Sequence, residues 1–141
     1  MASLENTVAV VTGAGGGIGR EIALHQAAAG ARVGLLARTA REIEETAALI
    51  AAKGGTALAL PVDLVDRAAV ETVLARIAEE FGPVDTLVNN HGSFRAFGPI
   101  WDCDPETWWS DVEINLRGTI HTCRLVAPAL LKRGLRRIVN L

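Results

Sequence analysis

Five glycines near the amino terminus carry the first chemistry that the sequence suggests. They are Gly13, Gly15, Gly16, Gly17 and Gly19. They follow the apolar run Val8–Val11, which is typical of a buried parallel strand. Glycine lets the backbone turn sharply and approach a ligand with no Cβ in the way. A helix that begins near Ile18 would direct its unpaired N–H groups and its positive dipole end at the turn. Strand, turn and helix together predict a phosphate-binding site.

The spacing of the glycines narrows the kind of phosphate loop. The G-x-G-x-x-G fingerprint is not matched, because Ile18 stands where the third glycine would be, and no lysine follows as in a P-loop NTPase. The pattern present is Thr-Gly-x-x-x-Gly-x-Gly, at Thr12, Gly13, Gly17 and Gly19. Placed between a strand and a helix, this pattern resembles the short-chain dehydrogenase/reductase family. The resemblance implies that the loop from Thr12 to Gly19, Ile18 included, binds a nicotinamide dinucleotide.

Arg38 indicates which dinucleotide to expect. In dinucleotide folds, an acidic residue about 20 positions beyond the glycine loop accepts hydrogen bonds from the adenosine ribose. Here that position is Ala37, and Arg38 and Thr39 follow it. A guanidinium can hold a phosphate through two hydrogen bonds and a threonine hydroxyl can add a donor, so we predict a preference for NADP(H) over NAD(H). The alternative is that Arg38 is a solvated charge, while Thr39 and Glu42 form a capping box.

Further positions match the family's cofactor site. The resemblance implies that Asp63, with Leu64 beside it, contacts the adenine ring; the alternative places Asp63 in a helix-entry loop, with Asp66 as the cap. Asn89-Asn90-His91-Gly92 is similar to the family's Asn-Asn-Ala-Gly, which makes Asn89, Asn90 and Gly92 cofactor-site residues. His91 departs from the pattern. It reaches the cofactor, shapes the entrance, or is only an accommodated replacement, and no catalytic role is assigned to it.

Asn115 is the one predicted catalytic residue. It matches the asparagine of the family's Asn-Ser-Tyr-Lys tetrad, which helps hold a water in a proton relay. Without the resemblance, a polar residue in mid-helix is more commonly a buried amide bonded to backbone. The family's serine and its Tyr-x-x-x-Lys have no counterpart here, since the sequence contains no tyrosine.

Strands and helices alternate along the chain and would bring these residues to one edge of a sheet. The pattern predicts strands over 8–11, 32–37, 57–61, 84–89 and 136–141, and helices over 18–29, 40–53, 67–81 and 104–131. Asp104 and Pro105 mark the start of the last helix, and Pro128 either kinks it or ends it early. We expect an α/β fold: a Rossmann-like, doubly wound parallel sheet with helices on both faces, forming a single domain over 1–141, truncated after the fifth strand.

A loop rich in aromatic residues precedes the last helix. Phe94, Phe97 and Trp101 lie between Ser93 and Asp104. Because loops at the carboxyl ends of strands meet the substrate in open α/β folds, this loop is a candidate for substrate contact. The alternative is that its aromatic side chains cover the sheet edge as core.

Composition excludes several classes of function. The net charge is −2, so nothing favours nucleic acid or an anionic membrane as a partner. No apolar run approaches the ~20 residues of a membrane span, and the amino terminus lacks the features of a signal peptide. The two cysteines have no metal-ligand spacing, and no metal site is predicted. We expect a cytoplasmic protein.

Three functions remain open. The first is the NADP(H)-binding portion of an oxidoreductase that interconverts a carbonyl and an alcohol, with the chain itself inactive because the catalytic part would follow Leu141. The second is a non-catalytic dinucleotide-binding module. The third is an assembly fragment, because in the family the helix over 105–131 contributes to a dimer interface, which also implies a homo-oligomer.

Overall fold

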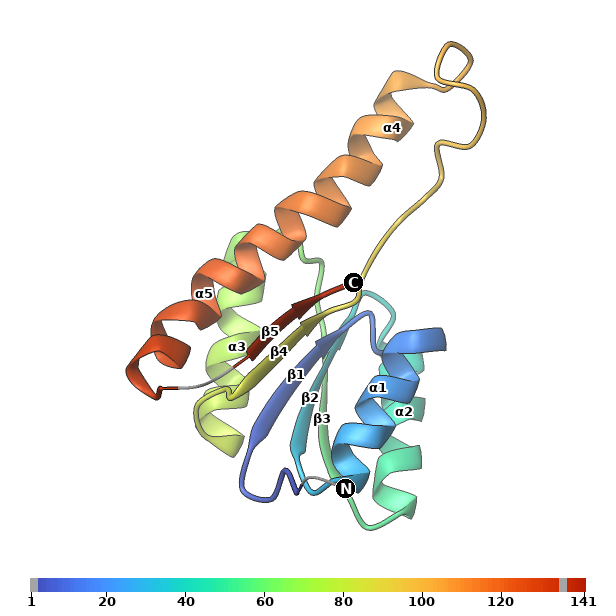
Figure 1. Cartoon of the computed structure of the whole chain (residues 1–141). Coiled ribbons are helices and arrows are strands. Elements are labelled where there is room, and N and C mark those ends of the chain that lie inside the picture. The colour runs from blue at the N-terminus through green and yellow to red at the C-terminus, as the bar shows by residue number, and fades with distance from the viewer. Residues whose placement is uncertain (1–2, 135–136) are drawn as a thin grey trace.

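Five apolar segments form the parallel strands of one sheet. The computed structural model describes residues 3–134 and 137–141. The strands are β1 (Val8–Thr12), β2 (Arg32–Ala37), β3 (Thr56–Pro61), β4 (Thr86–Asn89) and β5 (Arg137–Asn140). All pairings between them are parallel, and their order is β3-β2-β1-β4-β5 (Figure 1). The order reverses between β1 and β4, and open α/β sheets bind ligands at such a switch point.

The connecting segments form helices on both faces of the sheet. They are α1 (Gly17–Ala28), α2 (Ala40–Ala52), α3 (Arg67–Phe81), α4 (Pro105–Val112), a π-helical turn η1 (Glu113–Arg117) and α5 (Gly118–Lys132). Figure 1 shows α1 and α2 against one face and α3 and α5 against the other. The predicted doubly wound, Rossmann-like fold is therefore confirmed. No helix within residues 3–134 and 137–141 is long and apolar enough to cross a membrane.

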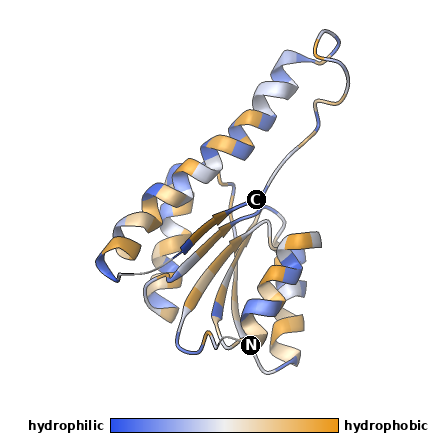
Figure 2. Cartoon of the chain, in the orientation of Figure 1, coloured by the Kyte–Doolittle hydropathy of each residue, from blue (hydrophilic) through white to orange (hydrophobic). Residues whose placement is uncertain are grey.

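Each face of the sheet has its own apolar core. The first joins the strands to α1 and α2 through buried residues that include Ala23, Ala27, Ile43 and Ile50. The second joins them to α3 and α5 through Val70, Leu74, Ile77, Val126 and Leu130. The central strands β1 and β2 are coloured mostly as hydrophobic in Figure 2 and are almost wholly buried, as expected for strands that are covered on both faces.

The last helix occupies nearly the residues that the sequence predicts, and it contains a π-helical turn that was not predicted. The helix begins after Asp104, whose carboxylate accepts from the Thr107 N–H at 2.8 Å, and it passes through the π-turn η1 without a break. Pro128 does not end it, because α5 continues to Lys132. Proline removes a single backbone hydrogen bond, and the burial of Val126 and Leu130 on either side holds the helix on the sheet. Arg136, the predicted start of the fifth strand, lies outside the described residues.

Candidate functional site

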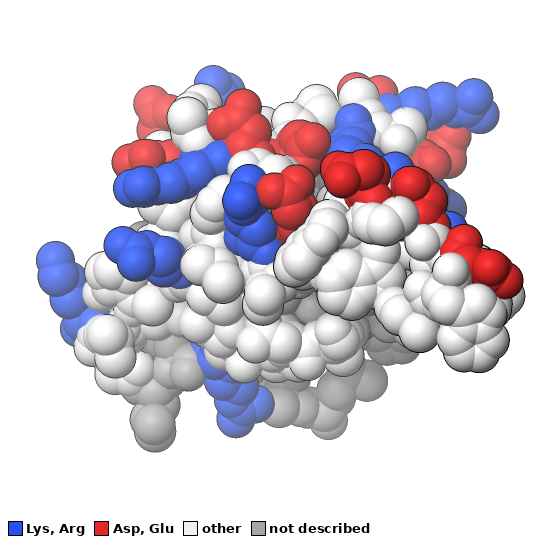
Figure 3. Space-filling view, turned by 90° about the horizontal axis from the view of Figure 1, so that it is seen from above, with Lys and Arg blue, Asp and Glu red and all other residues white. Residues whose placement is uncertain are grey.

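A pocket of about 230 Å³ lies at the switch point, beside the carboxyl ends of the strands. It gathers most of the predicted cofactor residues from segments that are far apart in the sequence. Its lining consists of Gly13, Gly15, Gly16, Ala37, Arg38, Thr39, Glu42, Val62, Asp63, Leu64, Val65, His91, Gly92 and Ile114. Figure 3 views the molecule from this end and shows charged side chains of both signs along one side of it, while the rest is largely uncharged.

The glycine loop has the backbone that a phosphate cradle needs. Gly13 and Gly17 have φ values of +64° and +50°, which other residues rarely adopt. At Gly19 a Cβ would lie 2.1 Å from the Gly13 carbonyl oxygen, so the helix start and the turn are in direct contact. Gly16 lines the pocket, and a Cβ there would meet no described atom within 4 Å. Because α1 begins at Gly17, its free N–H groups lie at this loop. The loop therefore fits a phosphate group.

Thr12 and Asn90 hold this loop from the strand side. The buried Thr12 hydroxyl accepts from the N–H groups of Asn90 and His91 at 3.0 and 3.2 Å. The Asn90 amide donates to the carbonyls of Thr12 and Gly13, at 3.2 Å each. An asparagine after a parallel strand can tie neighbouring backbone groups in this way, and neither side chain lines the pocket itself.

Two residues that the sequence analysis missed hold the loop from the helix side. The buried Thr46 hydroxyl lies 2.9 Å from the Ala14 carbonyl oxygen. Arg20 donates through Nε to the Thr46 hydroxyl at 3.0 Å and through Nη2 to the Gly15 carbonyl. With their carbonyls engaged by α1 and α2, the loop peptides are fixed in orientation. A threonine seven positions into a helix carries no local signal for such a contact.

Arg38 and Thr39 both line the pocket, and both are exposed. The predicted capping box is wrong, however. Thr39 precedes α2, but its side chain makes no cap hydrogen bond. Glu42 does not reach back to it because the Glu42 side chain packs on Gly15, where a Cβ would lie 2.7 Å from Glu42 Cβ and from Oε2.

Asp63 and Leu64 line the pocket beyond β3. The Asp63 carboxylate is exposed and accepts from the Val65 N–H at 3.0 Å, so it orders the helix-entry loop while facing the pocket. Asp66 caps α3, with the Ala69 N–H at 3.1 Å. Both interpretations of Asp63 therefore describe its surroundings, and its contact with adenine stays a prediction.

Besides Thr12, Gly17, Gly19 and Asn90, three further predicted site residues do not line the pocket. Ile18 is 69% exposed near the start of α1, where it lines a separate hollow. Asn89 is buried, and its amide pairs with the Asn140 side chain at 2.8 Å and the Thr122 hydroxyl at 2.7 Å. It therefore joins β4 to β5 and α5. Asn115 is exposed and lies in the π-turn.

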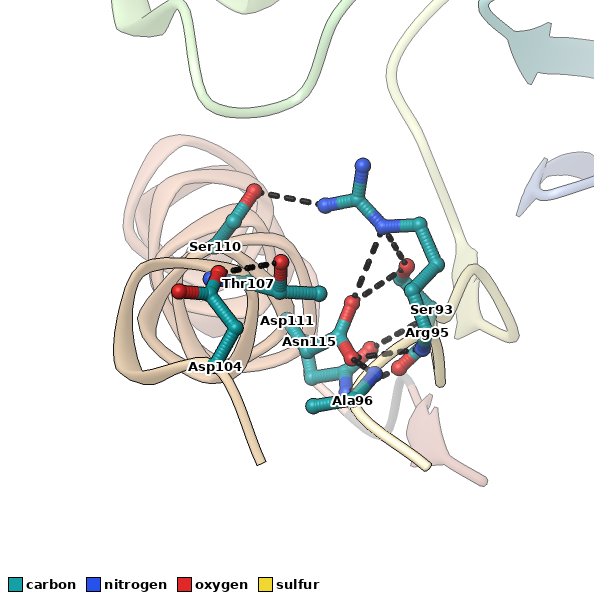
Figure 4. A network of polar contacts seen from close by, with 8 residues as sticks. All are labelled: Ser93, Arg95, Ala96, Asp104, Thr107, Ser110, Asp111 and Asn115. Atoms are coloured by element: carbon teal, nitrogen blue, oxygen red, sulfur yellow. Dashed lines mark hydrogen bonds and ion pairs between the residues drawn. The ribbon is translucent and has the colours of Figure 1, made fainter. Parts of the chain in front are cut away.

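Asn115 is bonded to backbone, as the alternative interpretation required, although it is not buried. Its side chain accepts from the Ser93 N–H at 2.7 Å and donates to the Ser93 carbonyl at 2.8 Å (Figure 4). This pair fastens the chain that leaves Gly92 to the long helix. The predicted catalytic role of Asn115 stays a prediction.

The loop after Gly92 and helix α4, which we call the arm (residues 93–112), project beyond the sheet (Figure 1). For this reason the interpretation of the arm's aromatic residues as core is wrong: Phe94, Phe97 and Trp101 are 76%, 84% and 81% exposed. The arm has no sheet beneath it, and it is held together by polar contacts and by the edge-to-face ring pairs Phe94–Phe97 and Trp108–Trp109.

Asp111 accepts four of those polar contacts (Figure 4). Its carboxylate accepts from the Ser93 hydroxyl at 2.6 Å, from the N–H groups of Arg95 and Ala96 at 2.6 and 2.9 Å, and from Arg95 Nε at 3.2 Å. The Ser93 hydroxyl first, and then the Ala96 and Arg95 groups, hold the pKa of Asp111 well below its usual range. The charged carboxylate is therefore the form that orders the loop.

We expect Asp111→Asn to loosen the arm. In asparagine one of the two oxygens becomes an NH₂ group that cannot accept, so either the two backbone N–H groups at Oδ2 or the Arg95 Nε–H at Oδ1 lose their acceptor, and the remaining bonds are no longer strengthened by a charge. The backbone amides of Arg95 and Ala96 should therefore exchange their protons faster in the variant, by about tenfold or more, since each net hydrogen bond contributes roughly 1 kcal/mol. Hydrogen exchange measured by NMR tests this, with β1 amides as the internal reference. Unchanged exchange at both positions contradicts the role of Asp111.

His91 connects three elements at the pocket wall. Its Nε2 lies 3.1 Å from the Ile114 carbonyl oxygen of η1, and its Nδ1 lies 2.7 Å from the Thr12 hydroxyl at the end of β1. A carbonyl only accepts, so Nε2 carries the proton and Nδ1 accepts from Thr12 in the neutral ring. Gly118 lets the helix approach, since a Cβ there would lie 2.8 Å from Nε2. Burial lowers the pKa of His91, and the bond to Ile114 opposes this in part.

The lowered pKa predicts a pH effect on stability. Below about pH 6.5 the unfolded chain takes up a proton at His91, while the folded ring stays neutral until lower pH. The unfolded state then binds more protons, so the free energy of unfolding falls as the pH drops. Wild type should therefore lose more stability between pH 7.5 and pH 5.5 than His91→Gln does. Urea unfolding at several pH values measures this, and because both proteins retain His25 and His121, equal losses would refute it.

The chain is similar in sequence to known dehydrogenases. Residues 7–141 match the sequence model of the short chain dehydrogenase family. The short chain dehydrogenase mpl6 of Monascus purpureus is 42% identical over 137 residues, which are 93% of this chain and 47% of that protein. D-threitol dehydrogenase of Mycolicibacterium smegmatis is 36% identical over 98% of this chain and 53% of its own length. The chain thus spans about half the length of these curated relatives.

Solved structures share its fold. A 3-ketoacyl-ACP reductase from Sinorhizobium meliloti 1021 superposes with a TM-score of 0.90 at 42% identity, over 94% of this chain and 52% of that one. A metagenomic short-chain oxidoreductase in complex with NADP has a TM-score of 0.92 at 34% identity, over 99% of this chain and 63% of its own. The sheet order and the glycine loop at its switch point define a Rossmann-like α/β protein. The chain belongs to the short-chain dehydrogenase/reductase family, whose members are oxidoreductases that use a nicotinamide cofactor.

Proposed function

We propose that this chain binds NADP(H) in the pocket at the switch point. We further propose that residues 1–141 are the dinucleotide-binding domain of an oxidoreductase that transfers hydride between the nicotinamide and a carbonyl or alcohol. The observation that carries the proposal is that the glycine loop and Arg38 line one pocket although β2 and α1 separate them in sequence. The similarity to a structure that holds NADP supports it.

Each group has a role in this proposal. The loop N–H groups and the positive end of α1 bind the pyrophosphate. Arg38 and Thr39 bind the 2′-phosphate of the adenosine ribose. Asp63 and Leu64 contact the adenine, and Gly92 leaves room for the nicotinamide half. Thr12 and Asn90 act on the cofactor by holding the loop.

The bound dinucleotide would supply the hydride, and the chain's own residues would orient it. Asn115 fixes Ser93 and so places the segment that follows Gly92. We propose that it also contributes to proton transfer. The long helix over 105–131 carries exposed apolar residues, among them Trp109, Leu116 and Ile120, which support association of two copies.

Titration of the purified chain with NADPH and NADH, followed by cofactor fluorescence, tests the cofactor. We expect saturable binding of both and tighter binding of NADPH. Absence of saturable binding overturns the proposal. Hydride transfer is tested by following NADPH absorbance with 3-ketoacyl-ACP and NADP⁺ reduction with D-threitol, the compounds in the names of two relatives. Binding without turnover of any carbonyl or alcohol would support a non-catalytic dinucleotide-binding module.

A further inference from the structure

A carboxylate lies in the pocket close to the groups proposed to bind phosphate. Glu42 is in the first turn of α2 and lines the pocket together with Arg38, Thr39, Gly15 and Gly16. A carboxylate at the amino end of a helix is stabilised by the helix dipole.

The side chain of Glu42 is held over the glycine loop. Gly15 is buried, and the Cβ and Oε2 atoms of Glu42 occupy the space into which a Gly15 side chain would extend, both 2.7 Å from a Cβ built there. The first turn of α2 is itself fastened to the loop. The Thr46 hydroxyl lies between the carbonyl oxygens of Ala14 and Glu42, at 2.9 and 3.1 Å, and Arg20 contacts the Glu42 carbonyl at 3.4 Å. The glycine loop and the first turn of α2 therefore form one unit, and the exposed Glu42 side chain extends from it over Gly15.

The charges at the pocket do not neutralise one another in pairs. Across residues 3–134 and 137–141, neither Arg38 nor Glu42 takes part in an ion pair. The pocket lining contains one cation, Arg38, and two carboxylates, Glu42 and Asp63. Arg38 attracts a phosphate, whereas a carboxylate repels it and accepts hydrogen bonds from hydroxyl groups instead.

We propose that Glu42 is a specificity-determining residue that opposes Arg38 at the 2′ position of the adenosine ribose. Its carboxylate disfavours the 2′-phosphate of NADP(H) and favours the 2′-hydroxyl of NAD(H). The chain's preference between NADP(H) and NAD(H) then depends on the opposed effects of the two charges, and Arg38 does not set it alone. This inference rests on the proposed binding of a dinucleotide in this pocket.

The test is Glu42→Gln, which removes the charge and keeps the size of the side chain. The variant should bind NADPH about fivefold more tightly, because two unit charges a few ångströms apart in a hydrated site interact by roughly 1 kcal/mol. NADH should bind equally well or more weakly. The ratio of the two dissociation constants is measured by fluorescence titration. The change in this ratio caused by Glu42→Gln should become smaller as salt is raised from 50 mM to about 500 mM, because salt screens an exposed charge.

Glu44→Gln is the matched control. Glu44 is an exposed carboxylate on the same helix and outside the pocket lining, so its removal changes net charge alone. For Glu44→Gln, the ratio of the NADPH and NADH dissociation constants should stay within about twofold of the wild-type ratio. If Glu42→Gln leaves the ratio unchanged, or Glu44→Gln shifts it as far, the inference is overturned while dinucleotide binding stands. If wild type binds neither dinucleotide, the proposed function fails first and the inference fails with it. Thermal melts establish that each variant is folded.

Discussion

Replacing Arg38 by alanine is expected to weaken NADPH binding by about 10- to 100-fold and to leave NADH binding within about twofold of wild type. Charge-assisted hydrogen bonds from a guanidinium to a phosphate contribute roughly 1.5–3 kcal/mol, which corresponds to this range. NADH has a hydroxyl where NADPH has the phosphate, so it does not gain from the cation. Parallel titrations of both dinucleotides measure the difference.

Two further variants show whether NADPH binding needs the paired hydrogen-bond donors of the Arg38 guanidinium or only its positive charge. Arg41→Ala removes an exposed cation at the start of α2 that pairs with Glu45 at 3.0 Å and lies outside the pocket lining, so both affinities should stay near wild type. Arg38→Lys keeps the charge without the paired donors, and NADPH affinity should fall between wild type and alanine. Equal losses for NADPH and NADH in Arg38→Ala would reject the phosphate assignment and leave Arg38 as a solvated charge.

The elements that local signals define were predictable from the sequence. The observed bounds of strand β2 and helix α3 are the predicted ones. The apolar pattern of each is flanked by residues that start or end the element through contacts with their near neighbours in sequence. Asp66 caps α3 at its start, and Gly82 follows its end with a φ of +95°. The nearness of the glycine loop to the end of β2 was also predictable from the sequence, because parallel strands bring their carboxyl ends to one edge of the sheet.

The contacts that were missed join residues far apart in sequence. The Thr39–Glu42 pattern is a sound local motif, yet the packing of Glu42 on Gly15 overrides it, and Gly15 lies 27 positions away. Thr46 and Asp111 were not singled out because a threonine or aspartate inside a helix has no periodic signature of its tertiary partner. His91 was recognised as a departure from Asn-Asn-Ala-Gly, but its bonds to Thr12 and Ile114 depend on how closely the helix approaches at Gly118.

Gly19→Ala is expected to have the largest effect on the fold of the site. The added Cβ would lie 2.1 Å from the Gly13 carbonyl oxygen and 2.4 Å from the Asn90 amide nitrogen. The carbonyl belongs to backbone that β1 and Asn90 hold in place, so the start of α1 must move away from the loop. Overpacking of this kind costs about 3 kcal/mol, which corresponds to a fall in melting temperature of roughly 10 °C for a chain of this size. Calorimetry measures the fall.

Gly16→Ala separates this clash from the general cost of adding a methyl group to the loop. Gly16 has a φ of −169°, extended backbone that any residue adopts, and its Cβ would meet no described atom within 4 Å. Its melting temperature should stay within about 2 °C of wild type, because an unstrained surface substitution changes stability by less than about 0.5 kcal/mol. Gly19→Ala should also weaken NADPH and NADH alike, since the displaced helix start serves the phosphates common to both. A selective loss of NADPH there would instead place the 2′-phosphate at the glycine loop and away from Arg38.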